Sequence, residues 1–366
     1  MKRILLAQLV PFMMITVLVA TFSEVACANV TGACDNCHTM HNSQGGVELH
    51  DEVHQALLTD DCVGCHSSTT GETIKTLGTS TVPVVYNTTL PVTPLAGGNF
   101  YWVESVSDAK GHNIFPDNID EELSEAPGTT ILTCGLSDSC HENLSNPYVD
   151  GIDPDLARLN GKYGCEGCHL SPAHHADDTV EPVIDSVEEG WYRFLSGHES
   201  GEGFGVSGIE DDDWQSTKSS SDHNEYLGDS SYNKTEPGNM RRLGNTVTGF
   251  CVGCHGNFHI EQRDGSWIRH PSDAVIPNSG DYQDAFGAGG SGTGIYNSDV
   301  PVAREVLSSV SSEVAVGFDM VMCLSCHVPH GSPYDDLLRW DYATMQAGGG
   351  SNTNGCFACH TSKDGV

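Results

Sequence analysis

The segment Cys34-Asp-Asn-Cys37-His38 places two cysteines three positions apart and a histidine directly after the second cysteine. The same C-x-x-C-H pattern occurs five more times along the chain. The further copies are Cys62-Cys65-His66, Cys165-Cys168-His169, Cys251-Cys254-His255, Cys323-Cys326-His327 and Cys356-Cys359-His360. A seventh, longer copy reads Cys134-Gly-Leu-Ser-Asp-Ser-Cys140-His141, with five residues between its cysteines. The chain has 15 cysteines, and all of them except Cys27 belong to these seven pairs.

A cysteine pair followed by histidine is typical of covalent haem attachment. The two sulfurs form thioether bonds with the porphyrin, and the adjoining histidine supplies a nitrogen to the iron. Zinc knuckles, disulfides and thioredoxin-like pairs use similar spacings, but none of them explains six copies that each end in histidine. We therefore predict haem c at the six C-x-x-C-H sites. At Cys134 and Cys140 we predict a seventh haem, with a local disulfide as the alternative.

The supply of histidine indicates what these haems do. Of the 18 histidines, seven belong to the motifs, and 11 remain as candidates for the opposite face of each iron. We predict distal ligands among His41, His54, His112, His174, His175, His223, His259, His270 and His330, and leave His50 and His198 out of this set. Iron with two imidazole ligands has no open position for a substrate. The pattern therefore favours electron transfer over enzymatic catalysis.

Several candidate ligands follow a motif so closely that they cannot reach the opposite face of their own haem. This group comprises His41, the pair His174-His175, His259 and His330. Each of them is expected to bind the iron of a neighbouring haem, which requires the haems to lie close together. The intermediate segments that carry His112, His223 and His270 are expected to fold back over a haem.

The composition does not suit a conventional apolar core. Among 366 residues, hydrophobic side chains make up 38%, and there are 41 glycines. The predicted fold is therefore mostly irregular, with loops, turns and short helices wrapped around a stacked haem chain and little β-structure. We expect helical turns at the motifs, a helix over Val302–Val316, and a short helix from Glu52 to Leu58 capped by Asp51. The glycine-rich and serine-rich stretches Thr69–Gly98 and Gly280–Val300 are expected to form loops.

The N-terminus and the net charge indicate an exported protein. Residues 1–28 have a basic start, an apolar run and an Ala26-Cys27-Ala28 cleavage site, as in a signal peptide, which leaves residues 29–366 as one domain with no membrane span. The formal net charge of −34 excludes nucleic acid and anionic membrane surfaces as partners. Redox proteins or extracellular electron acceptors are the expected partners, and the location is extracellular or, alternatively, periplasmic.

Several segments resemble one known family. The stretch Cys34-Asp-Asn-Cys37-His38-Thr-Met-His41 is similar to the start of the hexahaem outer-surface cytochromes of metal-reducing bacteria, which polymerise into conducting filaments. Gly111-His112-Asn113-Ile114, Arg269-His270-Pro271 and Cys323-Leu-Ser-Cys326-His327-Val-Pro-His330 follow in the family's order. The resemblance implies that His41 binds a haem of the next subunit, so that haems form a continuous row through a homopolymer. The middle of the chain, with Cys134, Cys140 and residues 164–226, departs from the family pattern.

Two other functions have the same motifs. A soluble periplasmic electron shuttle would complete all its haems within one chain, so a change of His41 would affect only its own subunit. A multihaem reductase would keep one five-coordinate haem that binds nitrite, cyanide or carbon monoxide. The surplus of histidine and the absence of a variant motif such as C-x-x-C-K make the reductase the less favoured of the two.

The intact mass of the mature protein tests the haem content. We expect an excess of seven haems over the polypeptide that begins at Asn29. An excess of six would return Cys134 and Cys140 to a disulfide, and no excess at all would contradict the haem interpretation.

Overall fold

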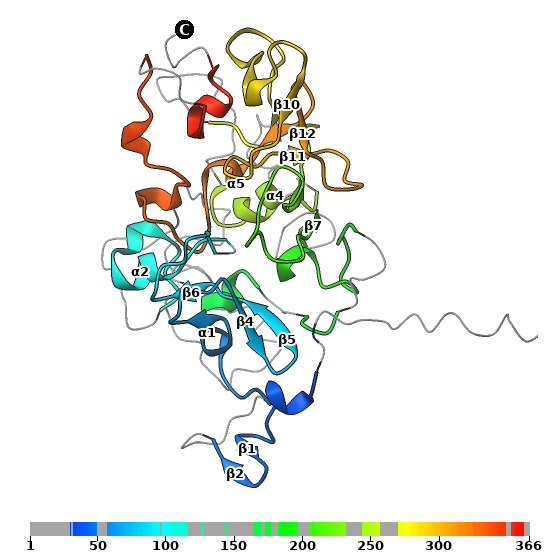
Figure 1. Ribbon diagram of the computed structural model, residues 1–366. Helices are drawn as coiled ribbons and strands as arrows, with labels where there is room; N and C mark the ends of the chain where they lie inside the picture. Colours follow the sequence, from blue (N-terminus) through cyan, green and yellow to red (C-terminus); the bar gives the residue numbers. More distant parts are fainter. Residues whose placement is uncertain are drawn as a thin grey trace, which may run out of the picture.

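The computed structural model describes a chain that extends from an N-terminal hairpin to a C-terminal lobe (Figure 1). The described residues are 30, 32–49, 57–95, 97–115, 126, 144, 164–169, 173–176, 182–196, 205–231, 244–256, 270–348 and 353–361. Strands β1 and β2 form one end of the molecule, and β10 and β12 lie toward the other end, near the C-terminus (Figure 1). The predicted signal peptide, the predicted helix residues 51–56 and the motif of Cys134, Cys140 and His141 lie outside the described residues.

The described helices are one or two turns long. The α-helices are α1 (Cys62–Cys65), α2 (Tyr101–Ser105), α4 (Val247–Val252) and α5 (Cys323–Cys326). The 3-10 helices are η1 (Cys34–Asn36), η2 (Asp108–Lys110), η3 (Gly164–Gly167), η4 (Tyr192–Phe194), η7 (Gly280–Tyr282), η8 (Ala285–Gly287), η9 (Asp335–Leu337), η10 (Tyr342–Thr344) and η11 (Gly355–Ala358). Six of these elements fall on the six C-x-x-C-H motifs, as expected. Two are capped by a side chain, since Asp61 accepts from the Gly64 N–H before α1 and Thr246 from the Gly249 N–H before α4.

The described strands are at most four residues long. They are β1 (Ser43–Gln44), β2 (Val47–Glu48), β3 (Ser67–Ser68), β4 (Ile74–Leu77), β5 (Ser80–Pro83), β6 (Tyr86–Asn87), β7 (Gly208–Ile209), β8 (Glu225–Leu227), β9 (Ala274–Val275), β10 (Thr293–Ile295), β11 (Ala303–Arg304), β12 (Glu313–Ala315) and β13 (Met320–Val321). Four two-stranded sheets pair β1 with β2, β3 with β6, β4 with β5 and β10 with β12. A fifth sheet has the order β7-β8-β11-β13-β9, with β8 and β11 parallel. The prediction of a mostly irregular fold with short helices is confirmed.

Two small apolar clusters hold the attachment motifs in place. One surrounds β10 and β12 and contains Val314, Val316 and Ala358 of η11, with the half-buried Cys359 packed against it. The other surrounds the five-stranded sheet and α4. Cys251 and Leu324, one from each of two motifs, pack against this second cluster. The limited core is therefore placed next to the cysteines that bind the cofactors.

The predicted helix over Val302–Val316 is wrong. Pro301 precedes β11, a loop follows, and β12 brings Val314 and Val316 into the core while Ala315 between them is half-buried. This alternation has a period of two, which is that of a strand, and the β-branched valines and four serines of the segment disfavour a helix. The predicted loops also contain short strands, among them the hairpin of β4 and β5. No described helix has the length and apolar character required to cross a bilayer.

A buried charge network joins the strands of the five-stranded sheet. The Glu225 carboxylate is fully buried and accepts hydrogen bonds from Arg304 Nε at 2.7 Å and from the Ser311 N–H at 2.7 Å. Arg304 also donates to Asp319 Oδ2 at 2.8 Å. Burial opposes the charge of Glu225, but hydrogen bonds from His223 and Arg304 outweigh it and lower the pKa of this carboxyl. Arg304 thus neutralises two carboxylates that water cannot reach.

We expect Arg304→Met to lower the free energy of unfolding by about 3–5 kcal/mol, because it leaves Glu225 buried without its cation. Lys110→Met is the matched control. Lys110 pairs at 2.9 Å with Asp335, whose side chain is 72% exposed, and such a pair contributes about 1 kcal/mol or less. Chemical denaturation followed by near-UV circular dichroism measures both variants. Equal losses in the two would contradict the assigned importance of the buried network.

Candidate functional site

All six described C-x-x-C-H motifs adopt the same turn. In each, the backbone N–H of the histidine donates to the carbonyl of the first cysteine, at distances from 2.8 Å for His38 to 3.1 Å for His327. This bond spans four residues, so both cysteines and the histidine project from a single helical turn. The motif spacing therefore sets a repeated local geometry, which is what attachment of one ring through two sulfurs and one nitrogen requires.

Five motif histidines face a second histidine from a distant part of the chain. The pairs and their ring-centre separations are His38 with His175 at 6.2 Å, His66 with His174 at 6.2 Å, His169 with His330 at 6.4 Å, His255 with His112 at 5.9 Å, and His360 with His270 at 6.2 Å. A direct ring contact in the same protein is much closer. His223 and Tyr296 stack at 3.5 Å with planes 8° apart.

The separation near 6 Å is the one that a shared metal ion imposes. A bond from a metal to an imidazole nitrogen measures about 2.0–2.1 Å, and the ring centre lies about 1 Å behind that nitrogen, so two rings across one metal are roughly 6 Å apart. All five pairs fall within a few tenths of an ångström of this value. The histidine pairs therefore fit a cofactor that holds one iron between two imidazoles.

Hydrogen bonds at Nδ1 orient these rings and leave Nε2 for the metal. Most acceptors are backbone carbonyls. They are Leu57 for His38, Pro83 for His66, Pro329 for His112, Arg193 for His169, Pro271 for His270 and Asp336 for His327. His360 is different, because its Nδ1 lies 3.1 Å from the carboxylate of Asp281. Such partners fix the tautomer and the ring plane of a metal-binding histidine.

Burial favours the neutral form of five of the paired imidazoles. It lowers the pKa of His169 to about 4, and it also lowers the pKa values of His66, His112, His174 and His270. Only the neutral ring has a lone pair to donate to a metal. The environment of these side chains therefore favours the state that binds iron.

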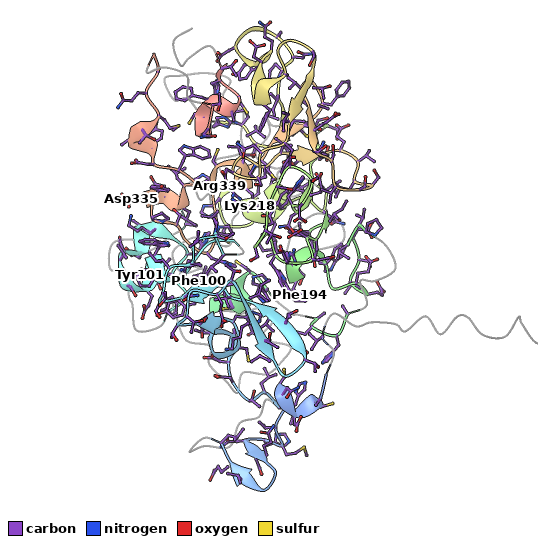
Figure 2. The ribbon with its side chains drawn as sticks, viewed as in Figure 1. Phe100, Tyr101, Phe194, Lys218, Asp335 and Arg339 are labelled. Atoms are coloured by element: carbon purple, nitrogen blue, oxygen red, sulfur yellow. The ribbon has the colours of Figure 1, made fainter. Side chains whose placement is uncertain are left out.

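Nine of the ten paired histidines, all except His360, border one large cavity of about 3430 Å³. It is several times larger than the ~300–1,000 Å³ of a pocket for one small molecule. Its lining includes the cysteines and histidines of five motifs, from Cys34 to His327. Phe100, Phe194 and Arg339 are further side chains of the lining (Figure 2). The size and the mixture of sulfur, imidazole and aromatic groups fit several porphyrins better than one ligand.

Neighbouring motifs approach each other through their cysteines. The side chains of Cys62 and Cys165 lie within hydrogen-bonding distance of each other, and so do those of Cys251 and Cys323. Cys37 also lies near Cys65, Cys168 near Cys251, and Cys326 near Cys356 and Cys359. Each described motif is thereby adjacent to the next described motif along the chain.

The alternative uses of cysteine find no support among the described residues. No disulfide joins any of the 12 cysteines in that part of the chain. No group of three histidine, cysteine or acidic side chains there is arranged to hold a metal ion by itself. A zinc site would require such a group, whereas a haem iron takes four of its ligands from the porphyrin.

Comparison with known proteins agrees with the motif geometry. Residues 314–365, which contain the last two motifs, match the family described as the doubled CXXCH motif. The C-type cytochrome OmcS of Geobacter sulfurreducens is 25% identical over 362 residues, which covers 85% of this chain and 79% of OmcS. The chain is a multihaem c-type cytochrome similar to OmcS. Its cysteine motifs carry covalently bound haem c.

Two solved structures align with this chain over most of its length. The Outer Membrane Cytochrome S Filament from Geobacter sulfurreducens has a TM-score of 0.47 at 20% identity, over 90% of this chain and 88% of that one. The OmcS nanowires from the same organism give a TM-score of 0.42 at 20% identity, over 86% and 85% of the two chains.

Four predicted distal ligands are not among the five described pairs. His41 is exposed beside β1, and His327 is in none of the five described histidine pairs. His223 stacks on Tyr296 and is in none of the five described histidine pairs, so its assignment as an iron ligand stays a prediction. It is fully buried, with Nδ1 bonded to the Ser219 carbonyl at 3.1 Å and Nε2 3.3 Å from Glu225. His54 and His259 lie outside the described residues.

The contact between Asp281 and His360 was not predicted from the sequence. Asp281 lies far from the motif of His360 in sequence and has no distinctive pattern around it. Its contact with the imidazole depends on how η7 packs against the segment after η11, where the Thr361 hydroxyl donates to the Asp281 carbonyl at 2.9 Å. No sequence signal of the kind used above identifies such a residue.

A close approach at Gly97 holds His330 opposite His169. The His330 N–H donates to the Gly97 carbonyl at 2.8 Å, and the ring lies 4.6 Å from that of Phe100. Gly97 has φ of +67°, and a Cβ there would lie 2.9 Å from the His330 ring. Glycine is required both for the backbone conformation and for the space.

We expect Gly97→Ala to displace His330 and to convert the haem of His169 partly to a high-spin form. Electron paramagnetic resonance of the oxidised protein measures this fraction. Gly289→Ala is the matched control, because Gly289 has a similar φ of +58° but nothing within 4 Å of an added Cβ. Both variants carry about 1–2 kcal/mol of backbone strain. A high-spin signal in both, or in neither, would contradict the role given to Gly97.

Proposed function

We propose that this cytochrome is an electron-transfer subunit whose haems are ligated by two histidines each, and that copies of it assemble into an extracellular filament. The observation that carries the proposal is the set of five histidine pairs with ring centres 5.9–6.4 Å apart. In this proposal His175, His174, His330, His112 and His270 are the distal ligands. Iron with both axial positions filled exchanges electrons without binding a substrate.

The order of the ligands along the chain supports a continuous row of haems. The consecutive residues His174 and His175 face the histidines of two different motifs, so their two haems must be neighbours. The consecutive residues Pro329 and His330 do the same for two more haems. The Pro329 carbonyl holds His112 opposite His255, while His330 faces His169. The cysteine contacts between successive motifs point to the same arrangement.

The N-terminal end of the molecule has the properties of a surface for a second copy. Its exposed apolar side chains are Met40, Val47, Leu49 and Leu57, and Met40 is 72% exposed. Clusters of this kind mark interaction sites in soluble proteins. The hairpin of β1 and β2 lies at the end of the molecule, where a neighbouring subunit can receive it (Figure 1). His41 is carried on this end, next to the exposed Met40.

The haem of His327 is the proposed acceptor for His41 of the next copy. His327 is exposed, and its Nδ1 is held by the Asp336 carbonyl at 2.8 Å, which leaves Nε2 for an iron. It differs from the other described motif histidines in that no described histidine faces it. A ligand supplied across the interface would complete the row from one subunit to the next. Secretion through the signal of residues 1–28 would place this polymer outside the cell.

We expect His41→Ala to abolish filaments and to leave one haem per subunit without its sixth ligand. Electron microscopy measures assembly, and electron paramagnetic resonance measures the high-spin fraction. Added imidazole should restore the low-spin spectrum without restoring filaments. Val306→Ala is the control, because Val306 is 77% exposed but lies in the loop between β11 and β12. Intact filaments in His41→Ala would contradict the assembly proposal.

A reductase with one open haem would also contain a motif histidine without an opposing histidine, as His327 is among the described residues. The two functions differ in the assembled wild-type protein. A filament subunit should bind neither carbon monoxide nor nitrite once assembled, whereas a reductase should bind both in every state. A shuttle would remain monomeric and low-spin, with the His41→Ala defect confined to one haem of that monomer.

A further inference from the structure

We propose that the carboxylate of Asp281 lowers the reduction potential of the haem attached at Cys356 and Cys359, by accepting a hydrogen bond from its proximal ligand His360. This inference rests on the proposed function, since it takes His360 and His270 as the two ligands of that iron. It concerns a residue outside every attachment motif.

The contact is held in place from both sides. Asp281 Oδ2 lies 3.1 Å from His360 Nδ1, and the two side chains are only 15% and 30% exposed. The Asp281 backbone carbonyl accepts the Thr361 hydroxyl at 2.9 Å, which ties η7 to the residue after His360. The ring of Tyr282 lies 5.0 Å from that of His360. The contact between Asp281 and His360 is therefore fixed by the surrounding fold.

The other described proximal ligands with an identified Nδ1 partner differ from His360 in the charge of that partner. His38, His66, His169 and His327 all donate to backbone carbonyls, which carry no net charge. The distal ligand on the same iron, His270, also donates to a carbonyl, that of Pro271. A carboxylate accepts a stronger hydrogen bond than a carbonyl because it is ionised. His360 is thus set apart by one full negative charge.

The charge acts on the iron through the imidazole. A carboxylate at Nδ1 draws the ring proton toward itself and gives the imidazole some of the character of an anion, which raises its basicity at Nε2. A more basic ligand stabilises ferric iron, which has the higher positive charge, more than ferrous iron. The partial burial of both groups reduces screening by water. The potential of this haem is therefore shifted downward relative to haems whose ligands donate to carbonyls.

A lower potential at one position makes the row of haems energetically uneven. An electron on the haem of His360 then has a higher energy than it has on a neighbouring haem of more positive potential. Transfer from the haem of His360 to that neighbour is therefore favourable. Asp281 thereby influences where electrons reside in the subunit, without taking part in binding any partner.

The test is a spectroelectrochemical titration of the full haem-loaded protein with Asp281→Asn. This variant keeps the size and the acceptor oxygen but removes the charge. We expect one component, with the amplitude of one haem, to shift to a more positive potential, and one low-spin ferric signal in electron paramagnetic resonance to change its g values. Asp281→Glu, which restores a carboxylate, should return both readouts toward the wild type.

Asp284→Asn is the matched control, because it removes the same charge three residues away, and Asp284 has no bond to His360 among the described contacts. Intact mass verifies that each variant keeps all its haems. An equal or absent shift in Asp281→Asn compared with Asp284→Asn would overturn the inference. Loss of one haem in Asp281→Asn alone would also overturn it, in favour of a purely structural role. Filament assembly is measured separately by electron microscopy, so the redox titration can be interpreted even if the protein does not polymerise.

Discussion

The pairing of five motif histidines with histidines from distant parts of the chain is the interaction on which the rest of this structure depends. The ring centres of these five pairs lie 5.9–6.4 Å apart, which is close to the separation that one iron between two imidazoles requires. Each pair closes a long loop, which costs conformational entropy that short helices and two-residue strands cannot offset. With the proposed ligation, covalent attachment of haem and coordination of its iron supply that stabilisation, much as metal binding does in small metal-dependent domains.

The sparse conventional structure serves to position these groups. The two apolar clusters pack against Cys251, Leu324 and Cys359, and the hydrogen bonds at Nδ1 aim the rings. Arg304 connects Glu225 to Asp319 within the five-stranded sheet, and His223 belongs to the same buried network. A chain with 50 acidic and 16 basic residues uses one of its few arginines there, where two carboxylates have lost their water.

The attachment turns could be predicted from sequence because they are local. In a C-x-x-C-H segment, the cysteines and the histidine lie within one helical turn, so the spacing alone places both sulfurs and the nitrogen on one side. The same reasoning predicts that His330 and the pair His174-His175 bind neighbouring haems, since a histidine so close to its own motif cannot cross the ring. The helix expected over Val302–Val316 failed because its valines also fit a period of two, and the packing of Val314 and Val316 decided between the two periods.

The sequence by itself determined that this chain carries covalently bound haem c at C-x-x-C-H motifs, because thioether formation needs only residues that are close together along the backbone. It also set the number of available histidines. Only the tertiary structure decided which histidine faces which motif, that His223 packs on Tyr296, and that His360 alone among the described proximal ligands has a carboxylate identified at Nδ1. The reason is that coordination and second-shell contacts join residues far apart in the chain, and their pairing depends on how the loops fold together rather than on any local pattern.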